Sequence, residues 1–158
     1  MQMHNATHGA GGSSLNRLAF SATAHCLTGC SIGEVLGMVI GTAWGWSNSA
    51  TILISIVLAF VSGYALTLLP LLRAGIALGT ALALALASDT LSIAIMEIVD
   101  NAIILVIPGA IDAILPDPLF WGSLALSLVV AGIAAFPANR ALIARGRGHA
   151  LVHRSHEP

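Results

Sequence analysis

Four long runs of apolar residues, each poor in charge, constrain the fold of this chain more than any other feature. They cover residues 15–46, 50–70, 74–107 and 119–139. A bilayer core about 30 Å thick is crossed by about 20 residues of α-helix, so each run is long enough to cross it. Because a segment in lipid must satisfy its own backbone hydrogen bonds, a helix is the expected structure for each run. The sequence predicts an all-α, polytopic membrane protein with four transmembrane helices.

The composition agrees with a surface that faces lipid. Hydrophobic residues make up 57% of the 158 residues and charged residues only 8%, whereas a soluble domain carries about 25% charged residues. The formal net charge of −1 excludes nucleic acid as a partner, since nucleic-acid binding needs a basic surface. Phosphate-binding loops, dinucleotide fingerprints and Ser–His–Asp patterns are absent from the sequence. The lipid bilayer is the expected partner.

The third run is too long for one simple span. A continuous helix over 74–107 would be about 50 Å long. Ser88, Asp89 and Thr90 offer N-cap chemistry in its middle. We therefore expect an interfacial elbow helix over 74–87 and the third span over 89–107. The domain boundaries follow: a disordered polar tail over 1–14, a four-helix transmembrane domain over 15–139 and a basic cytoplasmic tail over 140–158.

The arginines predict the orientation. With the N-terminus in the cytoplasm, every arginine falls on the cytoplasmic side, as the positive-inside rule requires. These residues are Arg17, Arg73, Arg140, Arg145, Arg147 and Arg154. Trp44, Trp46 and Trp121 then fall at the opposite interface, as an aromatic belt would. We expect a multi-pass protein of the bacterial inner membrane with both termini in the cytoplasm.

Acidic residues within the spans are the strongest functional signal. Glu34, Asp89, Glu97 and Asp100 lie inside or at the edge of the predicted helices. An ionisable group at mid-bilayer costs about 3 kcal/mol or more, and such residues are usually functional. Basic residues that could reach Glu34 or Glu97 are not evident in the sequence. These carboxyl groups must therefore carry protons, share them or hold a cation.

Two stripes run along the first predicted helix at a spacing of four residues. One carries Cys26, Cys30, Glu34 and Met38, and places chemically active groups on one face. The other consists of Gly29, Gly33, Gly37 and Gly41. Repeated glycines at this spacing let a second helix approach closely, so we expect helix packing here. Because four helices enclose little volume, a pathway through the protein would need a homo-oligomer, and we expect this helix at its interface.

The ionisable and sulfur-containing side chains of the spans form a candidate metal site. Its members are His25, Cys26, Cys30, Glu34, Asp89, Met96, Glu97 and Asp100. Thiolate and thioether groups favour Cu(I), whereas imidazole and carboxylate extend the range to Zn(II). The leading hypothesis is a protein that binds or transports a transition metal such as copper or zinc, with coupling to protons as an option. It assigns no catalytic residue and favours transport or binding over catalysis.

Other interpretations of the cysteines stay open. Cys26 and Cys30 at i, i+4 on a helix lie about 6 Å apart at Cα, within disulfide range. This distance permits a thiol–disulfide or quinone-linked oxidoreductase. The C-x-x-C motif typical of such redox pairs is absent from this segment. Both can equally be small packing residues, and residues 27–30 also match the box that precedes a lipidated cysteine, although His25 fits a signal peptide poorly. In a third hypothesis the polar groups only hold helices together in a non-catalytic assembly subunit.

Several spaced motifs carry a family resemblance. They are His25-Cys26-Leu27-x-Gly29, the stretch 88–96, Phe120-Trp121-Gly122, the stretch 136–139, and Ala144-Arg145-Gly146 with His149. With these motifs the chain resembles a bacterial membrane family catalogued as domain of unknown function 4396, over nearly the whole chain beyond the N-terminal tail. The resemblance implies a small membrane protein of undetermined activity and supplies no catalytic residues. Some members carry an acidic residue where this chain has Cys30, which implies that Cys30 is an interchangeable ligand or polar group.

Overall fold

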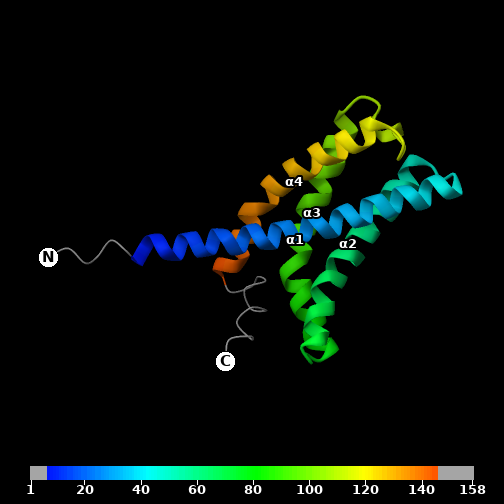
Figure 1. Cartoon of the computed structure of the whole chain (residues 1–158). Coiled ribbons are helices and arrows are strands. Elements are labelled where there is room, and N and C mark those ends of the chain that lie inside the picture. The colour runs from blue at the N-terminus through cyan, green and yellow to red at the C-terminus, as the bar shows by residue number, and fades with distance from the viewer. Residues whose placement is uncertain (1–6, 146–158) are drawn as a thin grey trace.

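The computed structural model describes residues 7–145 as a bundle of long helices (Figure 1). Within these residues, the regular structure consists of α1 (Thr7–Trp44), α2 (Asn48–Arg73), α3 (Leu78–Val106), the short 3₁₀ helix η1 (Ala110–Asp112) and α4 (Pro118–Ala144). Each long helix has the length and hydropathy to cross a membrane. The predicted class, an all-α polytopic protein with four transmembrane helices, is confirmed.

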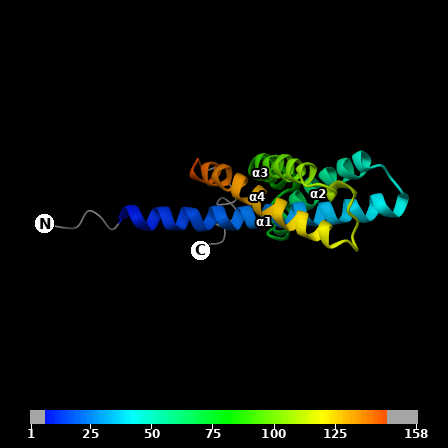
Figure 2. The same cartoon turned by 90° about the horizontal axis from the view of Figure 1, so that it is seen from above.

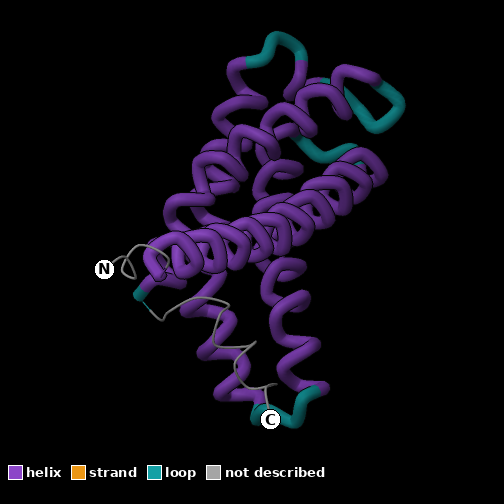
Figure 3. The backbone as a smooth tube through the Cα atoms, turned by 60° about the vertical axis from the view of Figure 1, so that its left-hand side comes forward, coloured by secondary structure: helices purple, strands orange, loops and turns teal. Residues whose placement is uncertain are grey.

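The bundle has two ends that differ in structure. The α1–α2 and α3–α4 connections lie together at one end, which we call the loop end, and the α2–α3 turn lies at the opposite end, the turn end (Figures 1 and 3). Gly45 and Gly75 adopt positive φ values of 64° and 80°, which glycine tolerates and which allow the chain to reverse within a few residues. The loop end also holds Trp44 and Trp46, whose rings stack with centroids 6.0 Å apart.

Local capping chemistry fixes where two helices begin. The side chain of Ser47 accepts a hydrogen bond from the backbone of Ala50 at the start of α2. Asp117 accepts one from the backbone of Leu119 at 2.8 Å, and Pro118 occupies the first turn of α4. Both caps satisfy backbone N–H groups that lack partners inside the helix.

The predicted break in the third run is wrong. Residues Leu78–Val106 form one continuous helix of 29 residues, about 43 Å long at 1.5 Å per residue, so there is no elbow helix over 74–87. The supposed capping groups are engaged elsewhere: the Thr90 hydroxyl donates to the carbonyl of Leu86, and the Ser88 hydroxyl to Asp89. These side chains return to their own helix or its neighbours, and the backbone has no need to break.

The first helix begins earlier than expected and is longer than the others. It starts at Thr7, inside the segment expected to be a polar tail, and its N-terminal part extends past the rest of the bundle (Figure 2). Residues 1–6 of that segment lie outside the described residues. At the other end of the chain, α4 continues to Ala144, and residues 146–158 of the expected basic tail, with Arg147, lie outside the described part.

The glycine stripe of α1 packs against α2 of the same chain. Methyl groups added at these glycines would meet Gly63, Ala59, Ser55 and Thr51 in turn, and at Gly29 the added carbon would lie 2.6 Å from the Cα atom of Gly63. Absence of a side chain is therefore what lets the two backbones touch. Because α2 covers these four glycines, a homo-oligomer through α1 stays a prediction that requires a different face of the helix.

The centre of the bundle is built from side chains of all four long helices, and those from α1, α2 and α4 are small. One cluster combines Cys26 and Cys30 of α1, Ala59 of α2, Ile93 and Met96 of α3, and Ala131 and Ala135 of α4. Small residues permit close helix packing in a membrane, where the hydrophobic effect between helices is weak. Toward the turn end, Asn139 donates to the Thr23 hydroxyl at 2.9 Å and joins α4 to α1.

Candidate functional site

The structure brings the predicted ligands together, as a row through the bundle from the loop end to the turn end. Glu34 and Asp100 interact with each other nearest the loop end. Glu97 follows beside Cys30. Cys26 lies next, close to Ser92 and Asp89. The predicted residues thus lie on one continuous path, and α1 and α3 supply all of them.

The loop-end half of the row consists of three buried carboxyl groups. Glu34, Glu97 and Asp100 are 8%, 4% and 1% exposed. Among the described residues, all their carboxyl oxygens lack a hydrogen-bond partner, although the groups approach one another. A buried carboxylate without a partner is strongly disfavoured. These groups must therefore carry protons, share them or hold a nearby cation.

The neighbouring serines do not relieve this deficit. Ser127 of α4 lies beside Asp100, but its hydroxyl donates at 2.9 Å to the carbonyl oxygen of Leu124 in its own helix. Ser123 does the same with Phe120. The serines of α4 therefore lie near the carboxyl groups but donate no hydrogen bond of standard geometry to them.

The turn-end half of the row is a hydrogen-bonded network. Asp89, which is 1% exposed, accepts hydrogen bonds from the hydroxyls of Thr67 at 2.5 Å and of Ser88 at 2.7 Å. The Nε2 atom of His25 lies 3.0 Å from the Thr67 oxygen. The Thr67 hydroxyl has one hydrogen and donates it to Asp89, so the Nε2–H group of His25 must be the donor to the Thr67 oxygen. A chain of hydrogen bonds therefore links His25, Thr67 and Asp89.

The soft ligands lie between the two halves. Cys26 and Cys30 are free thiols, 2% and 1% exposed, in the same core cluster as the fully buried Met96. Within the described residues, however, there is no group of three or more His, Cys, Asp or Glu side chains placed to hold one metal ion. The predicted ligand set is spread along the row, and any metal bound there would need side chains to turn toward it.

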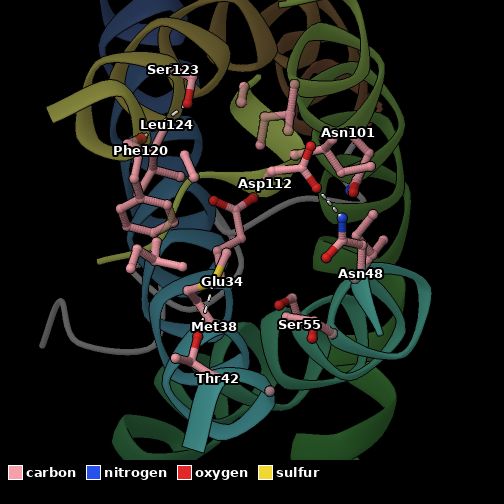
Figure 4. Close-up of a pocket in the computed structure, with 18 of the residues that line it drawn as sticks. Glu34, Met38, Thr42, Asn48, Ser55, Asn101, Asp112, Phe120, Ser123 and Leu124 are labelled. Carbon is pink, nitrogen blue, oxygen red and sulfur yellow. Dashed lines mark hydrogen bonds between the residues drawn. The ribbon is translucent and has the colours of Figure 1, made fainter. Parts of the chain in front are cut away.

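A pocket of about 220 Å³ opens above the carboxyl groups at the loop end. Glu34 and Asp100 form its floor, since they are the lining residues of α1 and α3 farthest from the loops. Figure 4 shows the Glu34 carboxyl group projecting into the middle of the pocket. At its mouth, Asn48 donates to the carboxylate of Asp112 at 2.7 Å and ties the start of α2 to the α3–α4 connection.

Some polar residues of the site were not singled out from the sequence. Thr67 joins His25 to Asp89, and Ser127 lies beside Asp100. Small or polar residues recur at every fourth position along α2 and α4, and this pattern is the signal that could have identified both. It runs through Thr51, Ser55, Ala59, Gly63 and Thr67 in one helix, and through Ser123, Ser127, Ala131, Ala135 and Asn139 in the other.

Four of the arginines used for the topology lie within the described residues, and all four are at the surface. Arg17, Arg73, Arg140 and Arg145 are exposed. Arg140 donates to the side chain of Asn16 at 2.8 Å and so connects α4 to the extended part of α1. These positions are compatible with contact between the arginines and lipid headgroups or water.

Four apolar helices around a row of buried ionisable groups define a polytopic membrane protein with an internal polar site. The chain belongs to the family described as Domain of unknown function (DUF4396), which matches residues 15–148. The resemblance seen in the sequence is thereby confirmed. No curated protein and no solved structure matches the chain.

Proposed function

We propose that this chain is a cation-handling protein of the bacterial inner membrane, with both termini in the cytoplasm, that binds its cation on Glu34, Glu97 and Asp100 in exchange for protons. The observation that supports this most directly is the lack of hydrogen-bond partners for these three buried carboxyl groups within the described residues. A carboxyl group in such surroundings is stable either with a proton or next to a cation. A site that can hold one or the other is what exchange requires.

The arrangement of the row supports a direction of access. The pocket leads from the loop end to Glu34 and Asp100, and the predicted orientation puts that end outside the cytoplasm. Beyond the carboxyl groups, the thiols and the network of Asp89, Thr67 and His25 continue toward the turn end. A proton or cation released from the centre would therefore meet polar groups on its way to the cytoplasmic side.

A second version of the proposal places the cation, a soft transition metal, on sulfur ligands as well as on the carboxyl groups. Cys26, Cys30 and Met96 pack in one cluster, and Glu97 lies beside Cys30. Thiolate, thioether and carboxylate together suit Cu(I) or Zn(II). In this version the metal passes from the carboxyl groups to the sulfur ligands in mid-membrane.

Proton movement in proteoliposomes tests the exchange. The full chain is reconstituted with a pH-sensitive dye inside the vesicles, and Zn(II) or Cu(I) is added outside. We expect a metal-dependent proton signal that Glu34→Gln and Asp100→Asn reduce at least tenfold. Asp117→Asn is the matched control, because Asp117 caps α4 at the loop end, outside the pocket. Equal signals in wild type and the Glu34 and Asp100 variants would refute the carboxyl exchange site.

The amount of bound metal distinguishes a site that includes the sulfur ligands from a site of carboxyl groups alone. Detergent-purified protein is loaded with Cu(I) or Zn(II) and the bound metal is measured in wild type and in a Cys26→Ala/Cys30→Ala double variant. A sulfur site predicts at least a tenfold loss of bound metal in the double variant. Equal retention in both proteins would remove the cysteines from the site and leave the carboxyl groups alone.

The same variants address the other two hypotheses. A redox role requires a Cys26–Cys30 disulfide, which thiol alkylation with and without reductant would detect. An assembly role requires that Glu34→Gln and Glu97→Gln change stability or association while cation binding and proton movement stay as in wild type.

A further inference from the structure

The pocket at the loop end is larger than an inorganic ion needs. Its volume is about 220 Å³, whereas one water molecule occupies about 30 Å³ of the liquid. A lone metal ion would leave most of the space to water. Ordered water in a protein typically makes two to four hydrogen bonds, and much of this wall offers none.

The walls of the pocket are chiefly hydrophobic and come from every long helix. Apolar lining residues include Met38, Trp46, Ile52, Ile104, Phe120 and Leu124. Pockets that bind small organic molecules are mostly apolar, with a few polar groups that fix the orientation of the ligand. Aromatic rings such as those of Trp46 and Phe120 also attract organic cations in a desolvated site. The wall is therefore suited to the body of an organic molecule.

The floor of the pocket selects for positive charge. Glu34 and Asp100, both more than nine-tenths buried, line the pocket with all four carboxyl oxygens unpartnered among the described residues. Among the described residues, no Lys, Arg or His lines the pocket. A third acid, Asp112, lies at the mouth. An anion would be repelled, and a neutral ligand would leave the negative charge of the floor unbalanced, but a cationic head group would balance it.

We propose that this pocket binds a small organic ammonium cation, with its apolar body against the hydrophobic walls and its charged head on Glu34 and Asp100. The inference rests on the proposed function, because the same carboxyl groups would exchange protons, and it adds the chemical class of the cargo. Burial of the apolar body provides affinity, and the carboxyl groups provide the selection for charge.

A matched pair of ligands tests the inference directly. Benzyltrimethylammonium carries a quaternary nitrogen next to an aromatic body, and neopentylbenzene is the same shape with carbon in place of nitrogen. Binding to the detergent-purified full chain is followed by calorimetry and by tryptophan fluorescence, to which Trp46 in the pocket wall contributes. We expect saturable binding of the ammonium ion with one site per chain and at least tenfold weaker binding of the neutral analogue.

Two kinds of variant locate the binding. Glu34→Gln and Asp100→Asn remove the charge of the floor and should each weaken ammonium binding at least tenfold, whereas Asp117→Asn should bind as wild type does. Ile104→Trp fills the pocket from α3 without changing either carboxyl group. It should abolish binding of benzyltrimethylammonium, because the aromatic body of the ligand then has no room in the pocket. Size-exclusion profiles and circular dichroism verify that each variant is folded.

The outcomes distinguish failure of this inference from failure of the proposed function. Equal binding of the neutral analogue, or unchanged ammonium binding in Glu34→Gln and Asp100→Asn, would overturn the inference. Absence of ammonium binding while Zn(II) or Cu(I) still drives proton movement would overturn it alone. Ammonium binding that depends on Glu34 but never moves a proton would support the inference and refute the exchange mechanism.

Discussion

Asp89 and Asp100 lie on the same helix and are equally buried, with 1% of each exposed, but their surroundings are opposite. Asp89, toward the turn end, accepts hydrogen bonds from Thr67 and Ser88. Asp100, toward the loop end, has no hydrogen-bond partner among the described residues and lines a pocket. Burial alone therefore does not mark a binding site. The absence of donors does, because it leaves a requirement that a ligand can satisfy.

This contrast divides the row into a hydrogen-bonded half and, under the proposed function, a binding half. Donors supplied by neighbouring residues stabilise the turn-end half when nothing is bound. The loop-end half is left incomplete, as expected of a site whose missing partner is a proton or a cation. The following experiments test that division, from the largest expected effect to the smallest.

Thr67→Val should have the largest effect on stability. It removes the hydrogen bond to Asp89 and the partner of His25, and should lower the free energy of unfolding by about 3 kcal/mol, since a buried charged group loses a donor. Denaturant unfolding in detergent micelles measures the change. Thr67→Ser keeps the hydroxyl and is the control. Equal losses in the two variants would mean that the network does not stabilise the turn end.

Replacement of each aspartate by asparagine compares the two halves directly. Asp89→Asn substitutes an N–H group for one of two accepting oxygens and should lower the free energy of unfolding by about 2 kcal/mol. Asp100→Asn removes an ionisable group that has no donor to lose, so it should leave stability unchanged or raise it by about 1 kcal/mol in the absence of ligand. If Asp100→Asn lowered the free energy of unfolding as much as Asp89→Asn, the two halves of the row would not differ in this respect.

Ligand protection should be confined to the binding half. Benzyltrimethylammonium at ten times its dissociation constant stabilises the bound form by about 1.4 kcal/mol, which corresponds to about tenfold slower amide hydrogen exchange in segments that open only from the free form. We expect slowing around Glu34 and Asp100 and little change around Thr67. Uniform slowing over both halves would indicate a site that involves the whole bundle.

Asn48→Ala should have the smallest effect. The hydrogen bond from Asn48 to Asp112 is exposed, so its loss should cost about 1 kcal/mol or less. Hydrogen exchange of residues 108–114 should become faster, whereas exchange at the turn end should not change. Ser49→Ala, at the neighbouring exposed position, is the control. Faster exchange near Asp89 would show that the two halves are coupled through the loops.

Helical periodicity alone places several of these residues relative to one another. Cys26, Cys30 and Glu34 at a spacing of four must share a face of α1, and Met96, Glu97 and Asp100 must lie close on α3. The structure then brings the two sets together, with Glu34 beside Asp100 and Cys30 beside Glu97. The predicted break at residues 88–90 was wrong, because the sequence does not show that Ser88 and Thr90 donate their hydroxyl hydrogens to Asp89 and to the carbonyl of Leu86.

The apolar runs by themselves determined that this chain has four membrane-spanning helices, since in lipid a backbone must pair within its own segment. The same runs, with acids at helical spacing, determined that ionisable groups are buried. Only the tertiary structure decided which acids have donors. Thr67 reaches Asp89 from another helix, whereas Ser127 turns to its own backbone beside Asp100. Hydrogen-bond partners across helices depend on packing angle and rotamer, and those are properties of the assembled bundle and not of any one segment.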